Sequence, residues 1–241
     1  MSIKKKNALI LVLGNILSFL RQRLGVFGPF SFKLVLGLAF GLASLLFFAK
    51  LSEDLLSNEL LMFDQIATGV IRFYSSDQVT SAMKTVSSLG SPLTLIVVGI
   101  VVMIYTGLVR KHIWDTLLVP ITLVGGIILN EALKLLFHRA RPELPHLVKV
   151  TGLSFPSGHS MMSFIFYGLI IYLLWLNFTH KFFRVLLTIL LVILILAIGI
   201  SRIYLGVHYP SDVLAGFAAG SFWLVACIFG LRGVRYYKAH Q

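Results

Sequence analysis

The stretch that decides the fold is an apolar run at residues 183–200, which reads FRVLLTILLVILILAIGI. Arg184, near its beginning, is the one charged residue in this run. A helix of about 20 apolar residues crosses the roughly 30 Å hydrocarbon core of a bilayer. The run therefore predicts a membrane-spanning helix and indicates that lipid is the solvent for much of the chain.

Five further stretches have the length and apolar character of membrane spans: Phe30–Ala49, Ser91–Val109, Trp114–Phe137, Met161–Leu176 and Val213–Leu231. The composition agrees, because 58% of the residues are hydrophobic and 12% are charged, whereas soluble domains carry about 25% charge. The single cysteine, Cys227, excludes an intrachain disulfide. We predict an all-α polytopic membrane protein with six transmembrane helices, forming one domain over residues 1–241.

The formal net charge of +12 could point to nucleic acid, but the basic residues gather at the ends of apolar runs and form no stripe on a polar domain. Short cytoplasmic loops carry an excess of Lys and Arg. Six spans place four basic clusters on one side: residues 4–33, 110–111, 181–184 and 232–238. We therefore predict that both termini are cytoplasmic, that residues 50–90, 138–159 and 201–209 face outside a bacterial-type plasma membrane, and that nucleic acid is no partner.

Two segments outside the spans have the pattern of helices that lie at a membrane surface. Asn7–Leu20, within the N-terminal segment 1–29, is short for a span and contains polar interruptions, so we expect an interfacial helix rather than a seventh crossing. Residues 50–90 carry apolar residues at helical spacing, which indicates amphipathic helices on the membrane or over the end of the bundle. Those apolar residues are Leu60, Phe63, Ile66, Val70 and Phe73.

The end of the third span is rich in residues that a simple connection does not need. Lys134 lies near this end, and Arg141 and Pro142 follow. Lys134 and Arg141 are seven residues apart, so a helix that persisted would project both from one face. Long basic side chains also reach toward headgroups as plain anchors, but an ionisable residue within a span is a candidate for function by default.

A second segment, Ser154 to Ser160, comes immediately before the fourth span and contains Pro156-Ser157-Gly158-His159. A Ser-Gly pair at the start of a helix offers free backbone N–H groups, close backbone approach at Gly158 and the positive end of the helix dipole. These features predict an anion site. The alternative is an ordinary helix N-cap at Ser157 with His159 as an interfacial side chain.

A third segment follows the fifth span and contains Ser201-Arg202, then His208, Pro210 and Asp212. His208 and Asp212 are four residues apart at a helix start that Pro210 marks, so the carboxylate can hold one ring nitrogen as N–H. The other ring nitrogen is then free to attack. A His–Asp pair that only stabilises a helix end is the alternative.

Taken together, the three segments resemble the signature of the type 2 phosphatidic acid phosphatase (PAP2) superfamily. The signature is complete: Lys134, six residues, then Arg141-Pro142; Pro156-Ser157-Gly158-His159; and Ser201-Arg202, five residues, His208, three residues, Asp212. Residues 134–212 would then be the catalytic region. The resemblance implies a membrane phosphatase that needs no metal and no cofactor.

The same resemblance implies a role for each signature residue. His208 would be the nucleophile, Asp212 would orient it, and His159 would be the general acid. The phosphoryl oxygens would be held by Lys134, Arg141, Ser157, Gly158 and Arg202. The substrate would be a lipid phosphate or diphosphate, such as undecaprenyl diphosphate, phosphatidylglycerophosphate, phosphatidic acid or diacylglycerol pyrophosphate. Basic groups outside the signature could favour a doubly phosphorylated headgroup or act as interfacial anchors: His138, Arg139, His146 and Lys149.

Four other interpretations use the same residues. Two histidines and a carboxylate could bind a metal ion, but three cations would repel it. A Ser–His–Asp hydrolase using Ser157 or Ser201 leaves the cations unexplained. Vanadium-dependent haloperoxidases share the superfamily but are soluble. A transporter or lipid-binding protein could use Glu131 and Lys134 as an intramembrane relay, but it would not need the two histidines.

Overall fold

The computed structural model describes residues 28–239, which are helical apart from the connections between helices and contain no strand. Six helices are long and apolar enough to cross a membrane, as the sequence predicted. They are α2 (Gly28–Leu56), α5 (Pro92–Ile104) with its π-helical continuation η1 (Tyr105–Val109), α6 (Ile113–Phe137), α7 (Gly158–Asn177), α8 (Lys181–Tyr204) and α9 (Pro210–Ala239). The predicted helix at Asn7–Leu20 lies outside the described residues.

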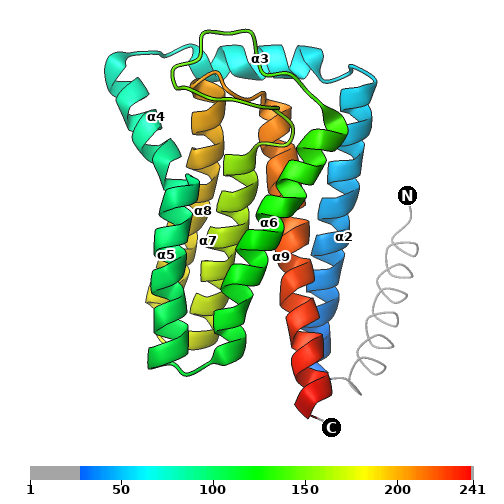
Figure 1. Cartoon of the computed structure of the whole chain (residues 1–241), viewed down its shortest axis with the longest axis vertical. Helices are drawn as coiled ribbons and strands as arrows, with labels where there is room; N and C mark the ends of the chain where they lie inside the picture. Colours follow the sequence, from blue (N-terminus) through cyan, green and yellow to red (C-terminus); the bar gives the residue numbers. More distant parts are fainter. Residues whose placement is uncertain (1–27, 240–241) are drawn as a thin grey trace, which may run out of the picture.

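The spans form one bundle whose two ends differ in their connections (Figure 1). One end carries helix α3 (Leu61–Arg72), the long loop 138–157 and the short connection 205–209; we call it the capped end. The opposite end carries the connections 110–112 and 178–180, the first turn of α2 and the last turn of α9. The three segments of the signature therefore all meet at the capped end.

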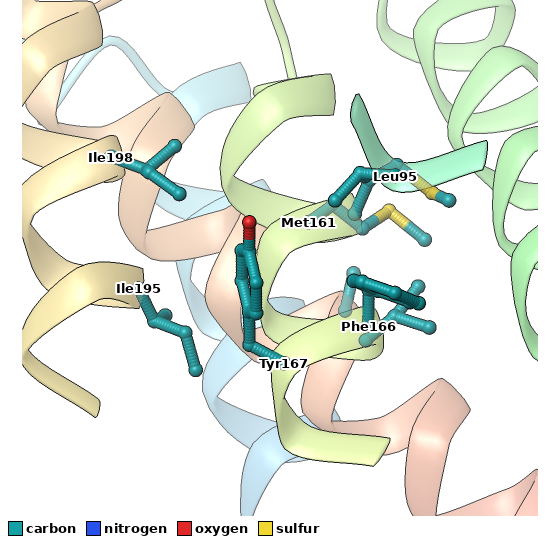
Figure 2. Close-up of a cluster of buried hydrophobic side chains, with 9 residues drawn as sticks. Leu95, Met161, Phe166, Tyr167, Ile195 and Ile198 are labelled. Atoms are coloured by element: carbon teal, nitrogen blue, oxygen red, sulfur yellow. The ribbon is translucent and has the colours of Figure 1, made fainter. Parts of the chain in front are cut away.

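Helix α7 lies at the centre of the bundle and packs against α6, α8 and α9. In α7, 50% of the residues in the apolar segment are buried inside the protein. The corresponding share is 17% in α2, α5 and α8, so most residues of these three spans can face lipid. The side chains of α7 form the main core with α5 and α8, where Tyr167 lies between Ile195 and Ile198 on one side and Phe166 on the other (Figure 2). The full buried cluster is Leu95, Met161, Met162, Ile165, Phe166, Tyr167, Ile195, Ile198 and Ala219.

Helices α7 and α9 approach each other through glycines on α9. A Cβ atom at Gly216 would lie 2.8 Å from the backbone oxygen of Ser157, and one at Gly220 would lie 2.7 Å from that of Met161. The Gly-x-x-x-Gly spacing places both glycines on one face, which lets the backbones of two membrane helices touch. This contact fixes the start of α7 against the start of α9.

Residues 50–90 form two short helices, after α2 has continued to Leu56 and so taken up the beginning of that segment. Helix α4 spans Asp77–Leu89, and α3 lies across the capped end (Figure 1). The expected apolar stripe of α3 is exposed, with Ile66 and Val70 at 56% and 70%, whereas Asp64 and Thr68 are buried. Helix α3 thus covers the bundle with its polar side and turns its apolar side outward.

Candidate active site

A cavity of about 410 Å³ opens among α5, α6, α7, the end of α8 and the two loops of the capped end, and Gly90 lines it just after α4. Six of the eight residues that the sequence singled out line it: Lys134, Arg141, Gly158, His159, Arg202 and His208. The other two, Ser157 and Asp212, are fully buried directly behind the cavity wall. Three sequence segments that are up to 78 residues apart therefore form one site, as the resemblance implied.

The first segment does not continue as a helix. Helix α6 ends at Phe137, because His138 adopts the left-handed conformation (φ 47°) and its N–H closes the helix on the Lys134 carbonyl. The condition for a shared helix face, a helix that persists to Arg141, is not met, and Lys134 and Arg141 share the cavity instead. Lys134 Nζ bonds Glu131 Oε1 at 2.9 Å. The Arg141 guanidinium donates to the carbonyls of Thr151, Gly152 and Val207, which fix its position.

The second segment forms the start of α7. Ser157 is its N-cap, and its hydroxyl accepts hydrogen bonds from Ser160 N and Ser160 Oγ. The Ser157 side chain therefore caps the helix and does not line the cavity. Gly158 and His159 do line it, and a Cβ at Gly158 would lie 3.0 Å from Asn130 Oδ1 and 3.7 Å from Lys134 Nζ. The missing Cβ leaves the helix N-terminus open to the lysine ammonium and to an anion.

His208 is held from both sides of its ring. Its Nδ1 lies 3.3 Å from Asp212 Oδ2, and its Nε2 lies 3.2 Å from Arg141 Nη1. An arginine N–H can only donate, so Nε2 accepts and the ring proton sits on Nδ1. Burial lowers the pKa of His208 to about 4, with the charges of Arg141 and Arg202 also lowering it and Asp212 opposing them. His208 is therefore neutral at pH 7, with the lone pair of Nε2 on the cavity side of the ring.

Arg202 brings the third cation to the cavity from the last turn of α8. Its side chain is 5% exposed, and Nη1 donates to Ser87 Oγ of α4 at 2.7 Å. Its Nε is buried and has no hydrogen-bond partner among the described residues. A buried N–H of a charged group is costly without an acceptor, so this atom marks a position for an anionic ligand.

Four residues outside the signature support the site, and the sequence did not assign them to it. Ser154 donates to Asp212 Oδ2, and Ser87 accepts from Arg202. Arg139 was interpreted as a headgroup contact or an anchor, but it bonds Asp212 Oδ1 at 2.6 Å and Asp64 Oδ2 at 2.7 Å. No signal in the sequence singled out Asp64, because a carboxylate on the polar face of an amphipathic helix is ordinary.

The electrostatics of the cavity favour an anion. Lys134, Arg141 and Arg202 converge there, and Arg141 remains protonated although burial lowers its pKa from 12.5. Within residues 28–239, no group of three or more His, Cys, Asp or Glu side chains is arranged to hold a metal ion. Fixed cations, a helix N-terminus and two histidines are the groups that phosphoryl transfer uses.

Comparisons with known proteins agree with this geometry. The family model that describes the sequences of the PAP2 superfamily matches residues 115–232 of this chain. Phosphatidylglycerophosphatase B of Bacillus subtilis (strain 168) is 34% identical over 178 residues, which are 73% of this chain and 86% of that protein.

Two crystal structures have the same fold. One is the first transmembrane PAP2 type phosphatidylglycerolphosphate phosphatase from Bacillus subtilis, with a TM-score of 0.74 and 28% identity over 82% of this chain and 96% of that one. The other is Aquifex aeolicus LpxE, with a TM-score of 0.55 and 22% identity over 70% of this chain and 94% of that one, which supports the fold alone. A complete signature gathered around one cavity, a family match and a relative aligned over most of its length give one conclusion: the chain belongs to the PAP2 superfamily, as a multi-pass membrane member.

Proposed function

We propose that the protein is a membrane lipid phosphatase that removes the terminal phosphate of a lipid phosphate or diphosphate through a phosphohistidine at His208. The observation that carries this proposal is the convergence of three cations and two histidines on a cavity whose remaining wall is largely apolar. The unpartnered Nε of Arg202 adds a specific place for a phosphoryl oxygen. A phosphate dianion fits the cationic part of this cavity, and the attached lipid fits the apolar part.

The chemistry follows from the positions of the histidines. The Nε2 lone pair of His208 attacks phosphorus while the bond from phosphorus to the lipid oxygen breaks, and His159 gives a proton to the departing oxygen. Water then attacks the phosphohistidine with His159 as base, which frees inorganic phosphate and restores the ring. Asp212 holds the proton on Nδ1 and balances the positive charge that develops on the imidazole.

The charge on the transferred phosphoryl group spreads over its three equatorial oxygens. We assign these oxygens to Lys134, Arg141 and Arg202, together with the backbone N–H at Gly158. Ser157 contributes by capping α7, which orients the free N–H groups at the start of this helix. No metal ion or cofactor has a part in this scheme.

The apolar wall indicates how a lipid reaches the site. Ile96 of α5 and Ile127 of α6 line the cavity, yet 51% and 46% of their surfaces are exposed on the side of the bundle. The cavity therefore extends to the lipid-facing surface between α5 and α6, where an acyl or prenyl tail can stay in the bilayer. The similarity to phosphatidylglycerophosphatase B makes phosphatidylglycerophosphate the first substrate to test, beside undecaprenyl diphosphate and phosphatidic acid.

We also infer that the capped end faces outside. Basic residues at the opposite end gather in the connection 110–112, in the first turn of α8 and in the last turns of α9: Arg110, Lys111, Lys181, Arg184, Arg232, Arg235 and Lys238. Such an excess of basic residues is typical of the cytoplasmic side. Protease treatment of spheroplasts should leave a tag on the C-terminus intact, and cleavage of that tag would reverse the orientation.

The direct test is phosphate release by the detergent-purified protein, with EDTA present, from the three lipids named above. Wild type should turn over at least one of them, and His208→Ala should abolish this turnover. A labelled lipid should leave label on the wild-type protein that survives alkali but not acid, as a phosphohistidine does. The matched control is His180→Ala, because His180 is exposed at the opposite end of the bundle.

The outcomes separate the possible functions. Turnover that disappears in His208→Ala and persists in His180→Ala supports the proposal and identifies the lipid class. Equal release by wild type and His208→Ala would exclude His208 as the nucleophile. Binding of a lipid phosphate without any release would favour a transporter or lipid-binding protein with a phosphate pocket.

A further inference from the structure

A buried chain of charges runs from α3 to Asp212 behind the cavity. Arg139 Nη1 donates to Asp212 Oδ1 at 2.6 Å, and Arg139 Nη2 donates to Asp64 Oδ2 at 2.7 Å. Asp64 and Asp212 are 1% and 0% exposed, and the Arg139 side chain is 10% exposed. None of these three residues lines the cavity, so none of them can contact a phosphate there.

Ser211 closes the chain of charges into a ring of hydrogen bonds. Its N–H donates to Asp64 Oδ1 at 2.9 Å, and its hydroxyl donates to Asp64 Oδ2 at 2.7 Å and accepts from Arg139 Nη1. Asp64 therefore holds both the arginine that contacts Asp212 and the residue immediately before Asp212. Arg139 also lies 4.0 Å from the ring of Tyr209, which limits the positions its guanidinium can take.

The two oxygens of Asp212 have separate tasks in this arrangement. Oδ1 accepts from Arg139, whereas Oδ2 accepts from Ser154 and from the backbone N–H of Tyr209 and faces His208 Nδ1. A carboxylate with only Oδ2 fixed could still rotate about its χ2 bond. The bond to Arg139 fixes this rotation and so fixes the direction in which the His208 proton is held.

The net charge of Asp64, Arg139 and Asp212 also matters for His208. Arg139 paired with Asp212 alone would neutralise the carboxylate that His208 needs when its ring becomes positive. Because Asp64 shares the arginine, the set Asp64, Arg139 and Asp212 keeps one net negative charge beside His208. In a buried site such a charge is weakly screened, so it favours the cationic phosphohistidine over the neutral ring.

We propose that Asp64 and Arg139 are positioning residues for the reaction: they orient Asp212 and preserve its negative charge for His208. This inference rests on the proposed function, since it assigns these residues to the same nucleophile. Asp64 would then be required for catalysis although α3 lies outside the region that the family matches. Asp64 precedes His208 by 144 residues in the sequence.

The test is Asp64→Asn, which keeps the size of the side chain and removes its charge. We expect kcat for the lipid substrate to fall by about 10- to 100-fold, the range found when partners behind a ligating histidine are removed. KM and the inhibition constant of inorganic phosphate should change by less than about twofold, because Lys134, Arg141 and Arg202 keep their contacts. The matched control is Asp77→Asn, the same substitution at an exposed position of α4, which should leave kcat unchanged.

A purely structural role for Asp64 predicts a different result. It would lower the melting temperature and the fraction of protein that binds phosphate, while each correctly folded molecule kept its wild-type kcat. Measuring kcat per phosphate-binding site removes this contribution. An unchanged kcat per site in Asp64→Asn would overturn the proposal.

A second variant tests the connection between the two residues. Arg139→Gln should lower kcat at constant KM, and the double variant Asp64→Asn/Arg139→Gln should lose no more than the worse single variant, since both act through Asp212. Multiplicative losses would contradict a shared path. If wild type releases phosphate, His208→Ala does not, and Asp64→Asn behaves as wild type, this inference alone fails; an inactive wild type would remove the proposed function and this inference with it.

Discussion

The capped end is built from two kinds of segment, and they differ in how clearly the sequence indicates their role. The segments 138–159 and 201–212 carry a compact pattern of histidines, cations and glycine, and several of these residues line the cavity: Arg141, Gly158, His159, Arg202 and His208. Helices α3 and α4 carry only isolated polar residues, and two of these, Asp64 and Ser87, contact Arg139 and Arg202 from behind. The motif therefore locates most of the groups that line the cavity, whereas part of their support comes from helices outside the motif.

After loss of the nucleophile, the largest effect should come from removing a cation that the motif supplies. Arg202→Ala takes away a buried guanidinium that faces the cavity, and we expect kcat/KM to fall by about 10³-fold, as when a preorganised donor to a transition-state oxygen is lost. Steady-state phosphate release is the measurement. Arg184→Ala, which alters an arginine at the opposite end of α8, is the control and should retain turnover. A loss below about tenfold in Arg202→Ala would mean that this residue serves the fold rather than the phosphate.

A smaller effect should follow from the α4 residue that holds the same cation. Ser87→Ala removes the acceptor of Arg202 Nη1, a hydrogen bond to a charged group, whose contribution is about 1.5–3 kcal/mol. Arg202 remains present but is less fixed, so we expect kcat/KM to fall by roughly tenfold or somewhat more. Ser88→Ala is the matched control, because Ser88 is the exposed neighbour on the same helix. Equal rates for the two variants would show that α4 only covers the site.

The sequence could predict the six spans because apolar length alone decides whether a helix crosses a bilayer. It could predict the cavity residues because their types and spacing are unusual together. The sequence placed the end of the third span at Phe137, where α6 ends, but it could not predict that His138 adopts φ 47° there. It predicted amphipathic helices at residues 50–90, but periodicity shows two faces of a helix and not which of them meets the protein. The buried ion pair of Asp64 with Arg139 turns the polar face of α3 inward.

The spacing of Gly216 and Gly220 is a signal that was present in the sequence and was not used. Two glycines four residues apart in an apolar run are typical of close helix contacts in membranes. Here they bring the start of α7, with Gly158 and His159, against the helix that begins with Asp212. The contact explains how two signature segments that are far apart in sequence keep a fixed separation.

The pH dependence of turnover tests whether burial sets the state of the nucleophile. An imidazole with the ordinary pKa near 6.5 would be mostly protonated at pH 5.5, which would lower the rate about tenfold. His208 has a pKa near 4, so its ring stays neutral there and its contribution to kcat should change by less than about twofold between pH 7 and 5.5. The measurement is kcat at saturating lipid, since the substrate phosphate titrates near pH 6 and affects KM. A fall of kcat toward acid pH that is centred at pH 6.5 would show that His208 is more exposed to water than the structure indicates.

Among the substitutions, the smallest effect should come from Glu131, the carboxylate at the mouth of the cavity. Its bond to Lys134 is short at 2.9 Å, but the glutamate side chain is 61% exposed, and an exposed ion pair contributes about 0–1 kcal/mol. Glu131→Gln frees Lys134 and removes a negative charge from the approach of the phosphate. We therefore expect inorganic phosphate to inhibit up to about threefold more tightly, with kcat unchanged. A loss of turnover in Glu131→Gln as severe as that of His208→Ala would instead place a proton relay at Glu131, the feature on which a transport function depends.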